Sequence, residues 1–160
     1  MALGQLQPAD HGGILTTMKP TPFDPARDYA PIPFEPAVLE AARRLKAAGL
    51  QWRPHVGCFA WDPDGYMPVP SPFPERVYFV LNLGRFTEIL GSVEAMQERL
   101  VWVPTWTQAS ALLAAAATPG AAANPVAAAN PAATRTPGAA ALLALYARLE
   151  AALDGPGGSR

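Results

Sequence analysis

The placement of proline limits where this chain can form regular structure. Of its 160 residues, 19 are proline. Six of them lie between residues 18 and 37, and four more recur at a constant spacing, at positions 119, 125, 131 and 137. Proline lacks a backbone N–H and clashes with the preceding helical turn, so neither stretch suits a helix or a central strand. We therefore expect the regular structure to lie mainly between these two stretches.

Composition divides the chain into five segments on this basis. We expect a flexible N-terminal arm, a proline-rich extended strap, a globular domain, an Ala/Pro-rich low-complexity linker and an amphipathic helix, over residues 1–17, 18–37, 38–113, 114–138 and 139–154. In the last segment one stripe carries Leu142, Leu145, Tyr146, Leu149 and Leu153, which predicts that this helix needs an apolar partner surface. That surface belongs either to this chain or to another.

Apolar patterns within the domain predict the order helix, strand, strand, helix, helix, strand, helix. The predicted strands are HVGCFAW, RVYFVLN and LVWV, at residues 55–61, 76–82 and 100–103. This order predicts an α+β fold with one small domain. We expect a short mixed or antiparallel sheet of about three strands, packed by three to four helices.

Residues with specific roles at helix ends support these predictions. Pro36 suits the first turn of a helix, and Gly49 suits the position just beyond its end. Ser92 is placed to cap a later helix, and Thr105 and Gln108 have the spacing of a capping box. Between the first two strands, DPDG has the chemistry of a turn rather than of a calcium loop.

One cysteine and one histidine lie three positions apart, which raises the question of a catalytic pair. Successive side chains of a strand alternate faces, so His55 and Cys58 should point to opposite sides. We therefore expect no catalytic pair and assign no catalytic residue. Free cysteine is among the most buried residue types, so Cys58 is predicted to be a small core residue.

A candidate binding surface follows from the same alternation. If the purely apolar faces of the first two strands join in the core, their mixed faces converge on the other side. This surface would carry the residues His55, Phe59, Trp61, Arg76, Tyr78 and Asn82. Arg85, at the start of the next helix, adds a donor for an anion. In the alternative reading, a helix or the strap covers this face.

Composition excludes several functional classes. Twelve basic and thirteen acidic residues give a formal charge of −1 without a basic tract, so we expect no nucleic-acid partner. One cysteine and two histidines fall short of a disulfide framework or a zinc pattern, and we expect no metal and no cofactor. No signal peptide or membrane span is evident, which predicts a cytoplasmic protein without a membrane partner.

Two separated stretches, GCFAWDPDG and LVWVPTWTQASALL, are similar in outline to the first and late strands of Nudix hydrolases. The paired glutamates that bind magnesium in that family are absent. The nearest stretch, RFTEILG, supplies only Arg85 and Glu88. The resemblance therefore implies no activity for this chain.

We expect a binding or interaction module whose ligand is a small molecule or a protein or peptide. One alternative is a small hydrolase or transferase for an anionic substrate, with His55 as acid/base and Arg76 or Arg85 as the anion clamp. Another is a structural subunit of an assembly. Binding is favoured because paired acid/base residues are scarce, and the oligomeric state is left open.

Overall fold

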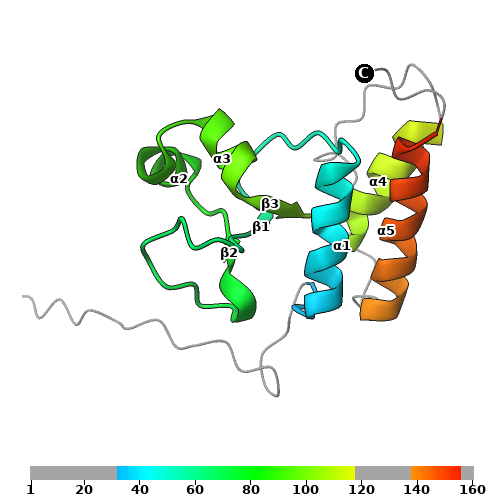
Figure 1. Ribbon diagram of the computed structural model, residues 1–160, viewed down its shortest axis with the longest axis horizontal. Helices are drawn as coiled ribbons and strands as arrows, with labels where there is room; N and C mark the ends of the chain where they lie inside the picture. Colours follow the sequence, from blue (N-terminus) through cyan, green and yellow to red (C-terminus); the bar gives the residue numbers. More distant parts are fainter. Residues whose placement is uncertain (1–31, 118–137, 156–160) are drawn as a thin grey trace, which may run out of the picture.

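A three-stranded antiparallel sheet lies between two groups of helices (Figure 1). The computed structural model describes residues 32–117 and 138–155. Its elements are α1 (Pro36–Ala47), β1 (Phe59–Trp61), the 3-10 helix η1 (Pro74–Arg76), β2 (Val77–Phe79), α2 (Leu83–Leu90), α3 (Val93–Arg99), β3 (Val101–Val103), α4 (Trp106–Ala117) and α5 (Ala139–Leu153). The predicted small α+β domain is confirmed: in the described part four α-helices, α1 to α4, accompany the sheet, and α5 is the separately predicted C-terminal helix.

The helix-end signals act as predicted. Gly49 follows α1 with a φ of +94°, a backbone conformation that favours glycine. The Ser92 side chain accepts a hydrogen bond of 3.1 Å from the Ala95 N–H at the start of α3. A capping box precedes α4, because the Thr105 N–H donates to Gln108 Oε1 at 2.9 Å and the Gln108 N–H donates to Thr105 Oγ1 at 3.3 Å.

The strands are shorter than predicted, and a bulge explains the shortening of β1. Gly57 has a φ of +97°, and its N–H donates to the Val80 carbonyl at 2.8 Å. The Val80 N–H donates in turn to the Cys58 carbonyl at 2.9 Å. Two residues of one strand therefore face a single residue of the other, which ends the regular ladder and leaves Val56 59% exposed.

The central strand of the sheet is β1, so β2 and β3 are its two edges. Both outer strands run antiparallel to β1. Residues directly opposite one another share a face, which groups Phe59 with Phe79 and Val103, and Ala60 with Tyr78 and Trp102. The two groups point to opposite sides of the sheet.

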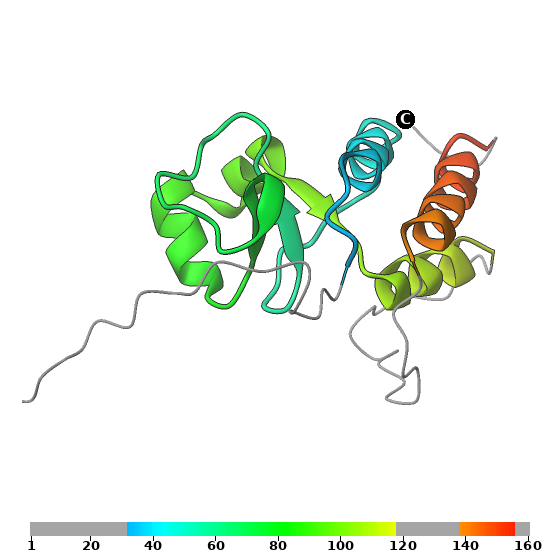
Figure 2. The same cartoon turned by 90° about the horizontal axis from the view of Figure 1, so that it is seen from below.

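Helices cover both faces of this sheet, which gives the domain two cores (Figure 2). The face of Phe59 packs against α1, with α5 and α4 beyond it. The face of Ala60 packs against α2 and α3, through the buried side chains Phe86, Leu90, Met96 and Leu100. The sheet therefore has no open face within the described part of the chain.

The C-terminal helix α5 packs on this chain's own domain, beside α1 and α4. Its buried side chains are Leu142, Leu145, Tyr146 and Leu149. The Tyr146 hydroxyl donates to the Pro104 carbonyl, and Arg44 of α1 pairs with Glu150 at 3.4 Å. The predicted stripe therefore finds its partner surface in the same chain.

Two predicted boundaries fall inside helices. The first helix begins at Pro36, within the predicted strap, and α4 continues to Ala117, within the predicted linker. The last helix begins at Ala139 with Gly138 as its N-cap, which agrees with the predicted segment 139–154. The predicted arm, the first part of the strap and most of the linker lie outside the described residues, at 1–17, 18–31 and 118–137.

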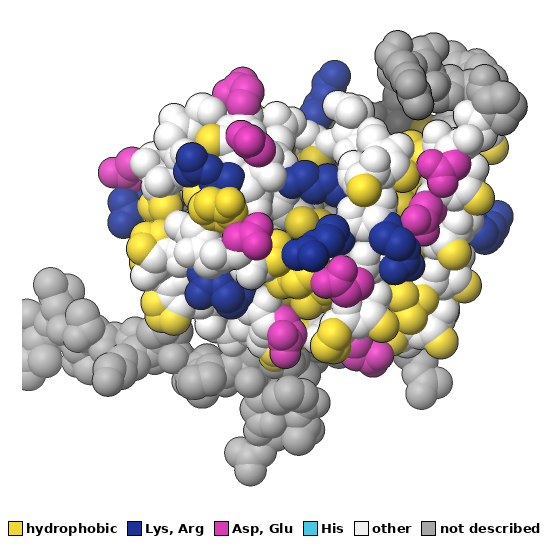
Figure 3. Space-filling view, in the orientation of Figure 1, with side chains coloured by type: hydrophobic (Ala, Val, Ile, Leu, Met, Phe, Trp, Pro, Cys, Tyr) yellow, Lys and Arg dark blue, Asp and Glu magenta, His cyan; other side chains and the backbone are white. Residues whose placement is uncertain are grey.

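Charges of both signs are interspersed on the face shown in Figure 3. Lysine and arginine side chains alternate there with acidic and apolar ones. Binding to nucleic acid is driven mainly by clustered positive charge, and this face does not gather it. None of the helices within residues 32–117 and 138–155 is both long and apolar enough to cross a membrane.

Candidate functional site

The predicted convergence of the two mixed strand faces is wrong. Alternation within each strand is as predicted, but Ala60, not Trp61, lies opposite Tyr78. Tyr78 and Trp61 therefore leave the sheet on opposite sides. The prediction assumed that one face had to be purely apolar. Because helices pack on both faces, each face carries apolar residues from both strands.

Of the predicted site residues on β1 and its flank, Phe59 and Trp61 share one face of the strand, and His55 lies apart from them. Phe59 is buried in the core beside α1, and Trp61 lies at its margin. The Arg43 guanidinium stacks over the Trp61 ring, 5.0 Å from its centroid. His55 lies in the loop before β1, where its ring Nδ1 is 2.9 Å from the Arg53 carbonyl oxygen.

His55 and Cys58 do not form a catalytic pair, because the side chain of each makes its hydrogen bond to a backbone carbonyl. The Cys58 thiol donates to the backbone carbonyl of His55 at 2.9 Å, and not to its imidazole. Cys58 is buried, as predicted, and burial raises the pKa of its thiol, although hydrogen bonding opposes that rise. A raised pKa keeps the thiol protonated and unreactive at neutral pH.

We therefore expect Cys58 to react with a thiol reagent such as dithionitrobenzoate only when the protein unfolds. In native buffer, labelling should be at least about 100-fold slower than in denaturant, because reaction needs both exposure and thiolate. Absorbance at the released chromophore's wavelength follows the reaction, and Cys58→Ala gives the background. Labelling of the native protein at the rate of the unfolded chain would contradict the buried position.

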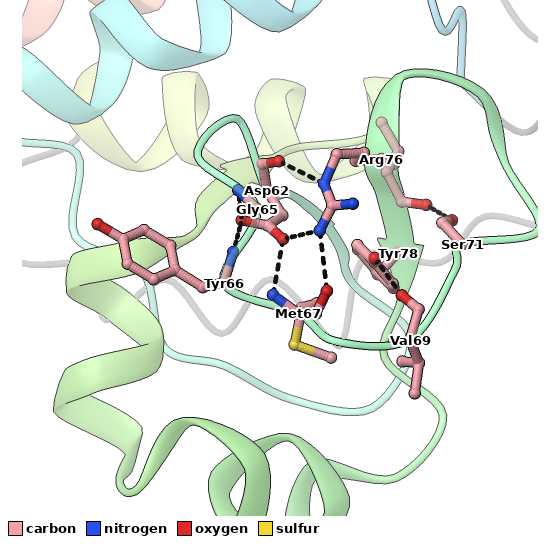
Figure 4. A network of polar contacts seen from close by, with 9 residues as sticks. Asp62, Gly65, Tyr66, Met67, Val69, Ser71, Arg76 and Tyr78 are labelled. Carbon is pink, nitrogen blue, oxygen red and sulfur yellow. Dashed lines mark hydrogen bonds and ion pairs between the residues drawn. The ribbon is translucent and has the colours of Figure 1, made fainter.

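The turn after β1 is organised by a buried carboxylate (Figure 4). Asp62 is the one fully buried charged residue in the described part of the chain. Its Oδ1 accepts the N–H groups of Gly65 and Tyr66, and its Oδ2 accepts the N–H of Met67, each at 2.9 Å. The predicted DPDG turn is present, and its first aspartate also fixes the start of the following loop.

Arg76 completes this network and is therefore not an open anion clamp. Its Nη2 lies 2.7 Å from Asp62 Oδ2 and donates to the Met67 carbonyl at 2.9 Å. Burial alone would raise the pKa of Asp62, but hydrogen bonds from Arg76 and from the N–H groups of Met67 and Tyr66 hold it below its usual value. Arg76 has a φ of +58°, and its neighbour Glu75 a φ of +56°. Neither is glycine, so both have a strained backbone, and the bonds to Asp62 and Met67 hold Arg76 in it.

The loop that follows is tied to β2 by two further hydrogen bonds, both drawn in Figure 4. The Tyr78 hydroxyl donates to the Val69 carbonyl at 2.7 Å. The Ser71 hydroxyl donates to the carbonyl of Val77. Residues 67–73 are thereby held alongside the edge strand of the sheet.

A groove of about 380 Å³ opens between this loop, β2 and α2. Its walls are almost entirely apolar and are formed by Met67, Val69, Pro72, Phe73, Tyr78, Phe79, Leu81, Asn82, Arg85, Phe86 and Ile89. Because Tyr78 and Phe79 leave β2 on opposite faces, a hollow that touches both must run along the outer edge of the strand. Leu81, at the end of this edge, is 72% exposed.

The backbone of β2 presents hydrogen-bonding groups along the same edge. The Arg76 carbonyl and the Val80 N–H bond inward to β1. In an antiparallel ladder the bonding direction alternates, so Val77 and Phe79 direct their backbone groups outward. Val77 uses its N–H on the Pro74 carbonyl and its C=O on Ser71. Phe79, the next outward-facing residue along β2, directs its N–H and C=O toward the groove.

Polar groups at one end of the groove come from the start of α2. Asn82 caps this helix, since its Oδ1 accepts the Arg85 N–H at 3.2 Å. The Arg85 guanidinium is exposed and pairs with Glu88 at 2.8 Å. An exposed pair of this kind is weak, so Arg85 can exchange partners at little cost.

Three of the seven predicted binding residues line this groove, namely Tyr78, Asn82 and Arg85. The prediction missed Phe79 and Leu81 because it placed them in the core. It also left the loop at 67–73 without a role. The signal that could have identified it is the run PVPSPFP, whose apolar residues lie between prolines and so cannot be buried in a helix or a central strand.

Hollows in the described part of the chain include two that lie away from this groove. One, of about 210 Å³, lies between α1 and α3, where the Lys46 ammonium already donates to the carbonyls of Glu98 and Leu100. The other is an open furrow between α4 and α5, where four alanines lie between larger side chains such as Trp106 and Leu113. Neither combines apolar walls with outward-facing strand backbone.

Comparison of the chain with protein-family models, with curated proteins and with solved structures finds no match.

Proposed function

We propose that this chain is a binding module that holds an extended peptide segment in the groove along the outer edge of β2. One observation carries the proposal: the groove is lined from both faces of an edge strand. It therefore places apolar walls next to the outward-facing backbone of Phe79. Peptide recognition by strand addition needs these two features together.

The chemistry of the groove favours a ligand with apolar or aromatic side chains. Phe73 and Phe79 provide ring surface on one side of the edge, and Tyr78 and Phe86 provide it on the other. Such walls suit proline-containing segments as well, because these are extended before they bind. Arg85 at the rim can meet a peptide carbonyl or carboxylate.

The enzymatic alternative draws less support from the geometry. Arg76, one of its two anion clamps, is engaged by Asp62. The ring of His55 is hydrogen-bonded to a backbone carbonyl rather than to a side chain that would orient it for proton transfer.

A single thiol is typical of a reducing compartment, and we propose that the module is cytoplasmic.

The proposal is tested by selecting phage-displayed peptides of about 12 residues, long enough to follow a strand edge, on the immobilised full-length chain. We expect enrichment of peptides rich in aromatic residues and proline. Titration of an enriched peptide should perturb the amide NMR signals of Phe79, Leu81 and Ile89. Leu81→Asp should weaken its binding about 30-fold, since a charge then faces the apolar ligand.

Val56→Asp is the matched control, because Val56 is also a large exposed apolar residue but lies outside the groove. It should leave the affinity unchanged. Equal affinities for the wild type and Leu81→Asp would refute the groove as the binding site. The same holds if the perturbed signals map to another surface.

A further inference from the structure

We infer that residues 18–31 of this same chain occupy the groove, so that an external peptide must displace them. This inference rests on the proposed function, because it names the first occupant of the same site. We call this self-covering, because a segment of the chain occupies the chain's own binding groove. Three observations support it: the place where the described chain begins, the residues that precede that place, and their reach.

The described chain begins beside the groove. Ile32 is buried in the core, and two residues later the ring of Phe34 lies 5.2 Å from the ring of Phe73. Phe73 is itself part of the groove wall. The segment that precedes Ile32 is therefore anchored next to one wall of the groove.

The sequence of this segment has the chemistry that the groove accepts. MKPTPFDPARDYAP, residues 18–31, contains four prolines together with Phe23 and Tyr29. Proline keeps such a segment extended and reduces the entropy lost on docking. Its two basic and two acidic residues balance, so apolar contact rather than net charge would hold it in the groove.

The segment is also long enough. An extended proline-rich chain rises about 3.1 Å per residue, so these fourteen residues reach roughly 40 Å from Ile32. A strand edge of the length of β2 needs a small part of that reach. Because the segment is tethered at the wall, its effective concentration at the groove is on the order of millimolar.

Photo-crosslinking of the full-length chain tests the location. Phe23 is replaced by benzoylphenylalanine, and irradiated protein is mapped by mass spectrometry. We expect cross-links to the groove residues Val69, Leu81 and Ile89, and their loss when Leu81→Asp is added. The same probe at Leu6, in the preceding arm, is the matched control and should not reach the groove.

Mixing ordinary and nitrogen-15-labelled chains before irradiation separates occupation within one chain from exchange between two. Cross-links confined to single chains support the inference. Cross-links between labelled and unlabelled chains overturn it in favour of a second copy as the occupant. Cross-links that do not reach the groove overturn it as well.

Competition provides a second readout that is independent of the probe. A phage-selected groove peptide should bind the Phe23→Ala chain at least about tenfold more tightly than the wild type, because its internal competitor is weakened. Leu6→Ala should leave the affinity unchanged. Equal affinity for all three chains, with binding still lost in Leu81→Asp, would overturn self-covering and leave the proposed function intact. If phage selection yields no peptide that binds the groove, while cross-links from residue 23 still reach it, the proposed function is overturned instead.

Discussion

Replacing Asp62 with alanine is expected to lower the free energy of unfolding by about 3 to 5 kcal/mol, because three hydrogen bonds from backbone N–H groups to a charged acceptor are lost together. The substitution leaves three backbone N–H groups of the turn without their acceptor. It also releases Arg76, whose left-handed backbone is held by its bonds to Asp62. Urea unfolding of the full-length chain, followed by tryptophan fluorescence, measures the loss.

Asp64 supplies the matched control, because it belongs to the same turn but is exposed. Asp64→Ala should change stability by no more than about 0.5 kcal/mol. Asp62→Asn, which keeps one oxygen acceptor but loses the charge, should fall between the two. Equal unfolding midpoints for the Asp62→Ala and Asp64→Ala chains would show that the buried network does not stabilise the domain.

The dependence on pH gives an independent check of the same network. The pKa of Asp62 is lower in the folded protein than in the unfolded chain. The stability that ionised Asp62 adds is therefore complete at pH values above its pKa in the unfolded chain, about 3.9. It is lost as the pH falls through the lower pKa of the folded protein. The stability difference between the wild type and Asp62→Ala should accordingly shrink in that acidic range and stay constant near neutrality.

Helix ends could be predicted closely from sequence because the residues that make them act locally. Ser92 caps the turn directly after it, and Thr105 and Gln108 bond to each other's backbone across three residues. Gly49 is needed because the chain adopts a positive φ at that position. None of these features depends on what the helix packs against, so one short stretch of sequence contains the whole signal.

The relation between strands could not be predicted in this way. Alternation fixes which residues of one strand share a face, but not which face of the next strand joins it. That depends on register, and a shift of one residue reverses the match. Here the bulge at Gly57 and the helices on both faces decide the register, and both are properties of the whole fold. The predicted six-residue surface failed for this reason.

The groove was missed because it is built from side chains that alternate across an edge. Phe79 was predicted to be a core residue, and it does touch the core beside α1. Because β2 is an outer strand, the same residue also borders the hollow outside it. Whether a strand is central or at an edge is not encoded in its own few residues, and this distinction separates a core position from a binding position.

Replacing Tyr146 with alanine is expected to reduce stability by about 3 to 5 kcal/mol, the range for removing a buried aromatic ring. Its ring is almost fully buried among α5, α1 and α4, and its hydroxyl donates to the carbonyl of Pro104. Burial raises the pKa of this hydroxyl, so it remains a donor throughout the neutral range. The loss tests whether the C-terminal helix belongs to the domain.

Two companion variants divide this effect into its parts. Tyr146→Phe keeps the ring but leaves the Pro104 carbonyl without its donor, which should cost about 1 to 3 kcal/mol. Arg148→Ala, an exposed change on the same helix, should have an effect within about 0.5 kcal/mol. If Tyr146→Ala were as stable as Arg148→Ala, α5 would not be docked in this chain. Its apolar stripe would then have to be covered by a second molecule, and the unfolding midpoint would rise with protein concentration. A midpoint independent of concentration, together with the large loss in Tyr146→Ala, places the helix within its own domain.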